Sequence, residues 1–296
     1  MGVHEQWFSC LDDAFVYSLK LPKRAASFTK GGREPMFLIE EREIGSVPLL
    51  HLTDNDGPAK KPVLLFYHGI TSAKEHNLHI AYTFAKKGFR VLLPDALHHG
   101  EREKSIVGEK RYLSFWDIVL QSIHEVPTIA EPFLQEGLID ENRIAIGGTS
   151  MGAITAYGAL AAYPWLCSGC CFMGAPQYME FSKAMFEKLE QHGVEVKEAQ
   201  KEAVLAKISP FDLTADIERL NRRPLFIWHG KQDDTVPFMY AEQFANRLFD
   251  AYQGKTDRFQ FIAEEGAGHK ISRKAMLAAA EFLPQAMGSS HVSRTT

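Results

Sequence analysis

Cysteine is scarce in this chain: 4 of 296 residues, at Cys10, Cys167, Cys170 and Cys171. So few cysteines, three of them clustered, exclude the disulfide framework that stabilises small secreted proteins. Cys167 and Cys170 form a C-x-x-C pair, but no second pair or histidine couple at zinc spacing accompanies it, so buried small apolar residues are expected. The first residues lack a basic segment followed by an apolar one, so we expect no secretory signal and a cytoplasmic location.

An excess of basic residues is also missing. The chain carries 33 Lys and Arg against 37 Asp and Glu, a formal net charge of -4. Because no basic surface is available to neutralise phosphates, nucleic acid is not an expected partner. The hydrophobic share of 45% supplies ample core material. We therefore expect one globular domain over residues 1–296, with a disordered tail at 288–296.

Charge is absent from one long segment, since neither a charged residue nor a histidine occurs from Ile144 to Met179. Its length would permit a membrane span. Glycines and a proline divide it into short pieces, however, so no span is expected. The segment is instead typical of strands and a helix at the buried centre of a sheet.

Eight short apolar segments predict strands, and segments with helical periodicity separate the later ones. The strands are expected near residues 36, 47, 62, 89, 143, 170, 224 and 258, and the helices over 74–88, 114–136, 151–163, 237–252 and 269–287. Turn residues around the first two strands favour antiparallel hairpins. The later alternation predicts right-handed βαβ units, and therefore a mostly parallel sheet with helices on both faces.

Residues 176–223 form a long interval between two of the predicted strands. Apolar residues such as Phe181, Met185 and Leu189 recur there at helical spacing among lysines and glutamates, which predicts an amphipathic helix followed by more helix. We interpret 177–209 as a small lid; the alternative is an outer helix that packs on the sheet without a role in binding. Met179, Met185 and Phe186 are candidate contacts to a short acyl group.

Gly148-Thr149-Ser150-Met151-Gly152 has the pattern G-x-S-x-G, and it lies between a predicted strand and a predicted helix. That is the setting of a nucleophile elbow, in which a strained turn lifts the serine out of the core. The flanking glycines leave room for strand and helix to approach each other. At the start of the helix, the backbone N–H of Met151 would face an oxyanion.

A serine nucleophile needs a base, and the base needs a group that orients it. In the elbow arrangement the order is Ser, acid, His, each at the carboxyl end of a strand. The segment WHGKQDDTVP offers Asp233 and Asp234 after one predicted strand, and EEGAGHK offers His269 after the next. We therefore predict Ser150, His269 and one of these aspartates as the catalytic residues.

From about Met36 to Met287 the sequence resembles α/β-hydrolases of the serine esterase type. HGKQDDTVP is similar to their acid loop H-G-x-x-D-x-x-V-P, which implies Asp233 as the acid and leaves Asp234 as the alternative. HGITSAKEHN is similar to the oxyanion loop of small bacterial esterases, and with PDALHHGER it resembles the YitV/YjfP-like group. The resemblance implies the α/β-hydrolase fold and the backbone N–H of Ile70 as first oxyanion donor.

These observations predict a carboxylic ester hydrolase that acts on small, short-acyl esters through a covalent acyl-enzyme, without metal or cofactor. Two alternatives remain: a serine peptidase or amidase of the same fold, and a non-catalytic binding protein. No oligomeric state is predicted.

Further histidines have less specific expectations. His98 and His99 should lie at the active-site edge, where they either touch substrate or make loop hydrogen bonds. His68 and His229, each before a glycine, are expected to brace their loops. His76 and His79 could share one helix face. We expect that face to be solvated, and a metal site there is the less favoured interpretation.

Overall fold

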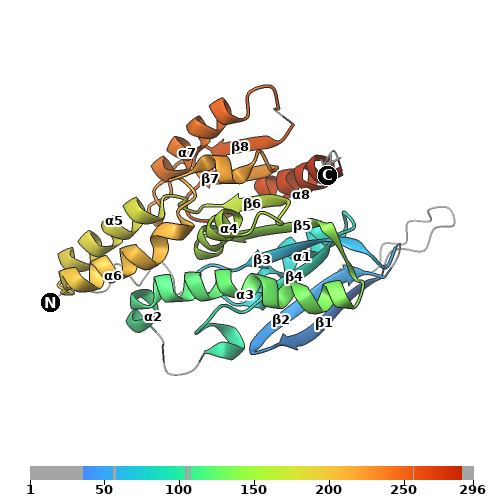
Figure 1. Cartoon of the computed structure of the whole chain (residues 1–296), viewed down its shortest axis with the longest axis horizontal. Coiled ribbons are helices and arrows are strands. Elements are labelled where there is room, and N and C mark those ends of the chain that lie inside the picture. The colour runs from blue at the N-terminus through green and yellow to red at the C-terminus, as the bar shows by residue number, and fades with distance from the viewer. Residues whose placement is uncertain (1–35, 56–57, 104–105, 107, 256, 289–296) are drawn as a thin grey trace. The chain divides into compact units, whose positions relative to one another are not determined.

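The computed structural model describes residues 36–55, 58–103, 106, 108–255 and 257–288 (Figure 1). All of these described residues belong to one compact unit. The first 35 residues of the predicted 1–296 domain, and all but Gly288 of the predicted 288–296 tail, lie outside the described residues. Gly288 itself ends the last helix. The single domain and the disordered tail therefore stay predictions.

Strands among the described residues form one eight-stranded sheet, in the order β1-β2-β4-β3-β5-β6-β7-β8. The pairs β1–β2 and β2–β4 are antiparallel, and all other neighbouring pairs are parallel. The predicted eight-stranded, mostly parallel sheet is confirmed. Its strands are β1 (Phe37–Ile44), β2 (Val47–Asp54), β3 (Lys61–Tyr67), β4 (Arg90–Pro94), β5 (Ile139–Thr149), β6 (Ser168–Phe172), β7 (Leu225–Gly230) and β8 (Phe259–Glu264).

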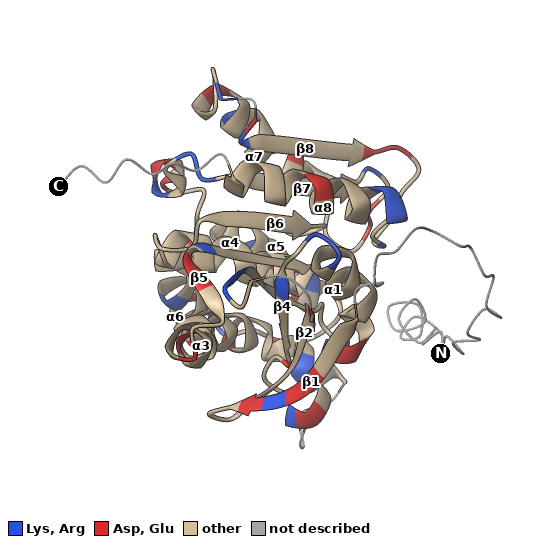
Figure 2. Cartoon of the chain, turned by 90° about the vertical axis from the view of Figure 1, so that its right-hand side faces the viewer, with Lys and Arg blue, Asp and Glu red and all other residues tan. Residues whose placement is uncertain are grey.

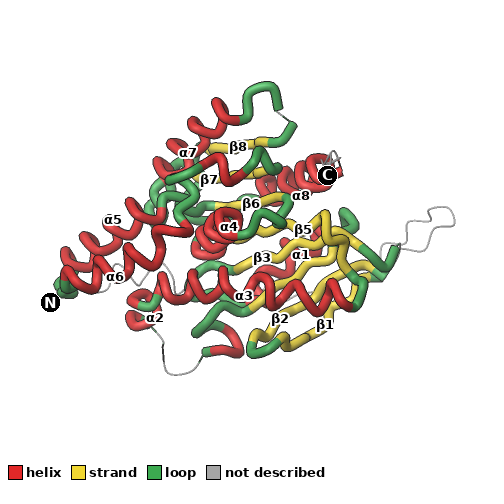
Figure 3. Tube along the Cα trace, viewed as in Figure 1, coloured by secondary structure: helices red, strands yellow, loops and turns green. Residues whose placement is uncertain are grey.

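Helices cover both faces of the sheet (Figures 1 and 3). Residues of α1 and α8 form one apolar core with the sheet, and residues of α3, α4 and α7 form the other. Because both faces are covered, every residue of β4, β6 and β7 is buried, as expected for parallel strands. The helices are α1 (Leu78–Ala85), α2 (Glu109–Leu113), α3 (Phe115–Gln135), α4 (Met151–Ala162), α5 (Tyr178–Gln191), α6 (Glu198–Ile208), α7 (Phe238–Ala251) and α8 (Arg273–Gly288).

Charged residues mark the edge of the sheet. Figure 2 shows both signs along the edge strand β1, whose residues are mostly exposed, whereas the interior strand β6 has no charged residue. The uncharged segment from Ile144 to Met179 is thus explained by burial, since it supplies most of β5, all of α4 and all of β6. None of the described helices is long and apolar enough to cross a membrane.

The long interval after β6 holds the two predicted helices, α5 and α6, which pack against each other (Figure 1). Gly193, with φ +82°, follows the end of α5 and allows the turn between them. Whether this segment acts as a lid stays a prediction.

The last helix begins later than predicted. We expected helix from His269, but α8 starts at Arg273. The Ser272 hydroxyl accepts a hydrogen bond from the backbone N–H of Ala275 (3.0 Å), as an N-terminal cap does. His269 therefore lies in the loop between β8 and this cap and is not part of a helix. The helix predicted over 74–88 likewise begins with a 3₁₀ turn, Lys74–Asn77, before α1.

Candidate active site

Ser150 lies in the turn between β5 and α4, in a backbone conformation that residues other than glycine rarely adopt. Its φ is +53° and its ψ is -117°. Holding a residue in such a region costs on the order of 1–3 kcal/mol. The turn is fixed from both sides, because the Ser150 N–H donates to the carbonyl of Phe172 (2.9 Å) and the Ser150 carbonyl accepts from Ala153 (2.9 Å) and Ile154 (3.0 Å).

The glycines of the G-x-S-x-G pattern are required by close packing. A Cβ on Gly152 would lie 2.0 Å from the Tyr67 carbonyl oxygen, and a Cβ on Gly148 would lie 2.3 Å from the carbonyl carbon of Gly152. Backbone atoms cannot yield such space without moving β3 or α4. The elbow conformation at Ser150 therefore follows from the local sequence.

The structure brings Ser150, His269 and Asp233 together. His269 Nε2 lies 2.9 Å from Ser150 Oγ, and His269 Nδ1 lies 2.7 Å from Asp233 Oδ2. The three residues follow β5, β8 and β7, whose carboxyl ends meet at one edge of the parallel sheet. Since the ionised carboxylate only accepts, the ring proton lies on Nδ1 and Nε2 is available to accept the serine proton.

Asp233 is buried among donors. Its Oδ1 accepts from the backbone N–H groups of Thr235 (3.0 Å) and Val236 (2.9 Å), and its Oδ2 lies 3.1 Å from Nε2 of the fully buried His229. Burial opposes ionisation of Asp233, but the hydrogen bonds from His229 and His269 outweigh it and lower the pKa of this carboxyl far below its ordinary value. Asp233 is therefore a stable anion at neutral pH.

The alternative acid, Asp234, is exposed, and one of its oxygens accepts from the Thr235 hydroxyl (3.3 Å).

His229 was expected only to brace its loop. It does so by donating to the Val236 carbonyl (2.8 Å), and it also contacts the Asp233 carboxylate. Its position four residues before Asp233 was the one signal for this contact.

One predicted oxyanion donor, Met151, follows Ser150 in the chain, and the other, Ile70, follows a glycine that packs against Ser150. Met151 is the first residue of α4 and is buried. Ile70 lies in the loop after β3, and a Cβ on the preceding Gly69 would be 3.4 Å from Ser150 Cβ. The two backbone amides thus lie on segments that flank Ser150, and their role as oxyanion donors stays a prediction.

Of the two candidate histidines at the edge of the site, His99 is fully buried and has both ring nitrogens in backbone hydrogen bonds. The loop-bracing alternative therefore describes His99 better than substrate contact does. His98 is half-buried and has φ +62°, and its contact with substrate stays a prediction.

The three apolar candidates, Met179, Met185 and Phe186, lie on α5. Phe186 is buried, while Met179 and Met185 are partly buried and pack against the core on the α3, α4 and α7 face. Their contact with an acyl group also stays a prediction. Among the described residues no group of three or more His, Cys, Asp or Glu could hold a metal ion.

We expect His99 to make the stability of the folded protein sensitive to acid. Burial and the neighbouring His68 lower the pKa of His99 to about 3; Arg111 also lowers it, while the Leu97 carbonyl and Asp95 oppose them. An unfolded histidine titrates near pH 6.5. Between about pH 6.5 and 3 the unfolded chain thus binds a proton that the folded chain does not, so the free energy of unfolding falls as pH falls.

Urea unfolding at pH 7.0, 6.0 and 5.0 measures this effect, with His99→Gln as the comparison because glutamine does not titrate. We expect the wild-type free energy of unfolding to fall more steeply than that of the variant over this range. Parallel pH profiles of the two proteins would show that His99 does not stay neutral in the fold.

The fold and this geometry define an α/β-hydrolase with a serine at the nucleophile elbow. The model of the prolyl oligopeptidase family matches residues 119–289, more than half of the chain. The chain is 41% identical over 250 residues to a Bacillus subtilis (strain 168) protein named "Putative esterase YitV", covering 83% of this chain and 98% of that protein. It is 31% identical over 253 residues to "Esterase YjfP" of Escherichia coli (strain K12), covering 84% and 99%.

Solved structures agree on the fold. TT1662 from Thermus thermophilus matches with a TM-score of 0.65 and 23% identity, covering 86% of this chain and 100% of that one. A puromycin-hydrolyzing peptidase of Mycobacterium tuberculosis matches with a TM-score of 0.62 and 18% identity, covering 84% of this chain and 39% of that one. This protein belongs to the prolyl oligopeptidase family of α/β-hydrolases, in the esterase group related to YitV and YjfP.

Proposed function

We propose that this protein is a carboxylic ester hydrolase that acts through Ser150, His269 and Asp233. The observation that carries the proposal is the continuous hydrogen-bond chain from Ser150 Oγ through the His269 ring to Asp233 Oδ2, with links of 2.9 and 2.7 Å. The esterase names of two relatives that cover most of the chain support the same reaction.

In the proposed acylation step, Ser150 Oγ attacks the ester carbonyl carbon while His269 Nε2 takes the hydroxyl proton. Asp233 stabilises the imidazolium and holds its ring in place. The backbone N–H groups of Ile70 and Met151 bind the oxygen that becomes negative. The tetrahedral intermediate then collapses, the C–O bond to the alcohol breaks, and His269 returns the proton to the departing alcohol.

Deacylation repeats the same proton movements with water. His269 removes a proton from water as its oxygen attacks the acyl carbon, and it then protonates Ser150 Oγ as the acid leaves. The low pKa of Asp233 suits both steps, because a permanent anion supports the imidazolium each time it forms.

For the substrate we propose small esters with short acyl groups. Met179, Met185 and Phe186 would provide apolar contacts from α5, the first helix of the 177–209 segment. A cytoplasmic location is part of the proposal, supported by the free thiols of the three cysteines in the described part of the chain.

A panel of p-nitrophenyl esters of increasing acyl length, with an aminoacyl p-nitroanilide, tests this function. We expect hydrolysis of the acetate and butyrate esters, little hydrolysis of the anilide, and no enzymatic hydrolysis in a parallel Ser150→Ala panel. The prolyl oligopeptidase family match makes the amidase the alternative. A higher kcat/KM for the anilide would favour it, and rates that climb toward long acyl chains would overturn the short-acyl assignment.

A further inference from the structure

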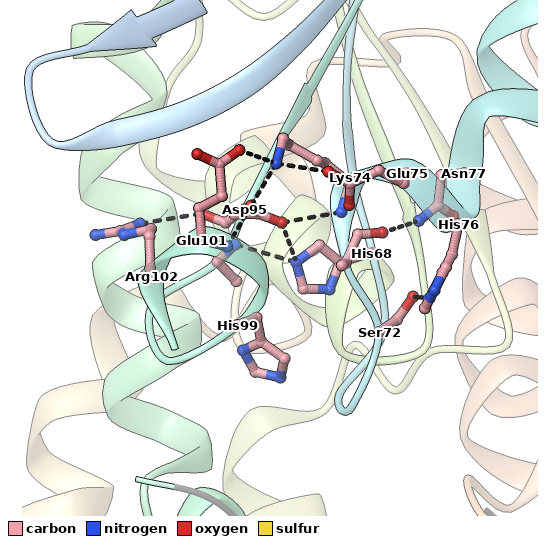
Figure 4. A network of polar contacts seen from close by, with 12 residues as sticks. His68, Ser72, Lys74, Glu75, His76, Asn77, Asp95, His99, Glu101 and Arg102 are labelled. Atoms are coloured by element: carbon pink, nitrogen blue, oxygen red, sulfur yellow. Dashed lines mark hydrogen bonds and ion pairs between the residues drawn. The ribbon is translucent and has the colours of Figure 1, made fainter. Parts of the chain in front are cut away.

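Two histidines link the loop after β3 to the loop after β4, and each accepts a hydrogen bond from the other's loop. His68 Nε2 accepts from the backbone N–H of Ala96 (3.1 Å), and His99 Nε2 accepts from the backbone N–H of Thr71 (3.1 Å). The two rings lie 5.0 Å apart between centroids (Figure 4). Both side chains are almost fully buried, so the exchange of contacts takes place away from solvent.

The contact of the second nitrogen of each ring shows which nitrogen carries the proton. His68 Nδ1 lies 2.7 Å from the Gly69 carbonyl, and His99 Nδ1 lies 2.8 Å from the Leu97 carbonyl. A carbonyl only accepts, so each Nδ1 carries the hydrogen and each Nε2 keeps its lone pair for the opposite amide. A protonated His99 would turn an N–H toward the Thr71 N–H and lose this contact.

The segment between these contacts contains Ile70, the proposed oxyanion donor. His68 holds the Gly69 carbonyl on one side of it, and His99 holds the Thr71 amide on the other. Thr71 has φ +64°, a conformation that a β-branched residue adopts only when its surroundings impose it. The His99 contact therefore stabilises an unfavourable backbone conformation directly after Ile70.

The loop that carries His99 is held by several hydrogen bonds to Asp95. The fully buried carboxylate of Asp95 accepts from the Lys74 N–H (2.9 Å), the Lys74 ammonium (3.0 Å) and the Glu101 N–H (3.0 Å), as Figure 4 shows. Arg102 donates to the Asp95 carbonyl (3.1 Å). A Cβ on Gly100 would lie 2.2 Å from Asp95 Oδ1, so the backbone also packs closely on this carboxylate. The His99 ring on this loop can therefore hold the Thr71 amide in a defined position.

We propose that His99, together with His68, is a positioning residue that holds the Ile70 amide in place as oxyanion donor. The inference rests on the proposed function, because the donor role belongs to the proposed acyl transfer. His99 acts through Thr71 and has no contact with substrate in this account. The low pKa of His99, caused first by burial, keeps its acceptor available at every pH at which the enzyme would work.

Two amide variants show whether the hydrogen bond from Thr71 to His99, or only the volume of the side chain at this position, matters for activity. In His99→Gln the amide oxygen can reach the place of Nε2 and accept from Thr71, whereas in His99→Asn the shorter side chain can retain only the contact on the Leu97 side. Removing one oxyanion donor typically costs about 10²–10³ in kcat. For a misplaced donor we expect kcat to fall roughly tenfold or more in His99→Asn. In His99→Gln we expect a smaller loss, and in both variants a KM close to the wild-type value.

The assay uses the full chain and p-nitrophenyl acetate, with active sites counted by titration with a fluorophosphonate. A trifluoromethyl ketone, which binds as a tetrahedral oxyanion adduct, provides the second readout. Its inhibition constant should rise in His99→Asn by the same factor by which kcat falls. A purely structural role would lower the melting temperature and the number of active sites without moving either value per active site.

Several results would overturn the proposal. Wild-type kcat and ketone affinity per active site in His99→Asn would exclude positioning, and a raised KM with unchanged kcat would indicate substrate contact instead. If His99→Asn does not fold, replacing Thr71 by its α-hydroxy acid removes the same hydrogen bond from the donor side, and an unchanged kcat there would equally contradict the proposal. A wild-type protein that hydrolyses no ester would instead refute the proposed function itself.

Discussion

Ester hydrolysis by Ser150→Ala is expected to fall on the order of 10⁶-fold, as losses of catalytic serines do elsewhere. The variant lacks the atom that would form the acyl bond, while His269 and Asp233 keep their own contact. Folding should be little affected, because the Ser150 side chain makes no capping hydrogen bond to α4. The measurement is kcat/KM for p-nitrophenyl acetate, with melting temperature as the check on folding.

Ser122→Ala is the matched control for this loss. Ser122 is also buried, and its hydroxyl donates to the Ile118 carbonyl of its own helix, α3. We expect its kcat/KM to match that of the wild type. If Ser150→Ala retained hydrolysis near the wild-type rate while folded, Ser150 would not be the nucleophile.

Asp233→Asn should give the second largest loss, about 10⁴-fold in kcat. An amide nitrogen at this position can donate to His269 Nδ1, which would move the ring proton to Nε2 and leave the base unable to accept from Ser150. The remaining amide oxygen can still accept from the Thr235 and Val236 N–H groups, so the loop should keep its shape.

Asp234→Asn provides the control one residue away, because Asp234 is exposed and was the alternative acid in the sequence. Its kcat should stay within about twofold of wild type, because substitutions of exposed side chains usually have small effects. Equal losses in the two variants, or the larger loss in Asp234→Asn, would remove Asp233 from the proposed triad. Pre-steady-state bursts with p-nitrophenyl acetate would show which step slows.

Much of the fold was predictable because burial acts on the sequence directly. All eight apolar segments became strands. The interior strands had to be apolar, because helices cover both faces of the sheet there. The proximity of Ser150, Asp233 and His269 was predictable for a related reason. Each directly follows a parallel strand or lies in the loop after it, and the carboxyl ends of such strands meet at one edge.

Other features depended on contacts that no local pattern encodes. The start of α8 at Arg273 follows from the Ser272 cap, and periodicity alone extended the helix to His269. The Thr71–His99 contact joins residues 28 positions apart through one backbone amide, so side-chain patterns could not indicate it. The burial of Lys74 was not predictable either. Its sequence context suggests a surface lysine, yet it is buried beside Asp95.

Labelling with a fluorophosphonate shows whether Ser150 is the reactive nucleophile. The folded protein is incubated with a fluorophosphonate, its intact mass is measured, and the modified residue is located by peptide mapping. We predict one phosphonyl group per chain, on Ser150, and no incorporation into Ser150→Ala. If the folded wild-type protein takes up no label, or carries it on another residue, Ser150 is not the nucleophile.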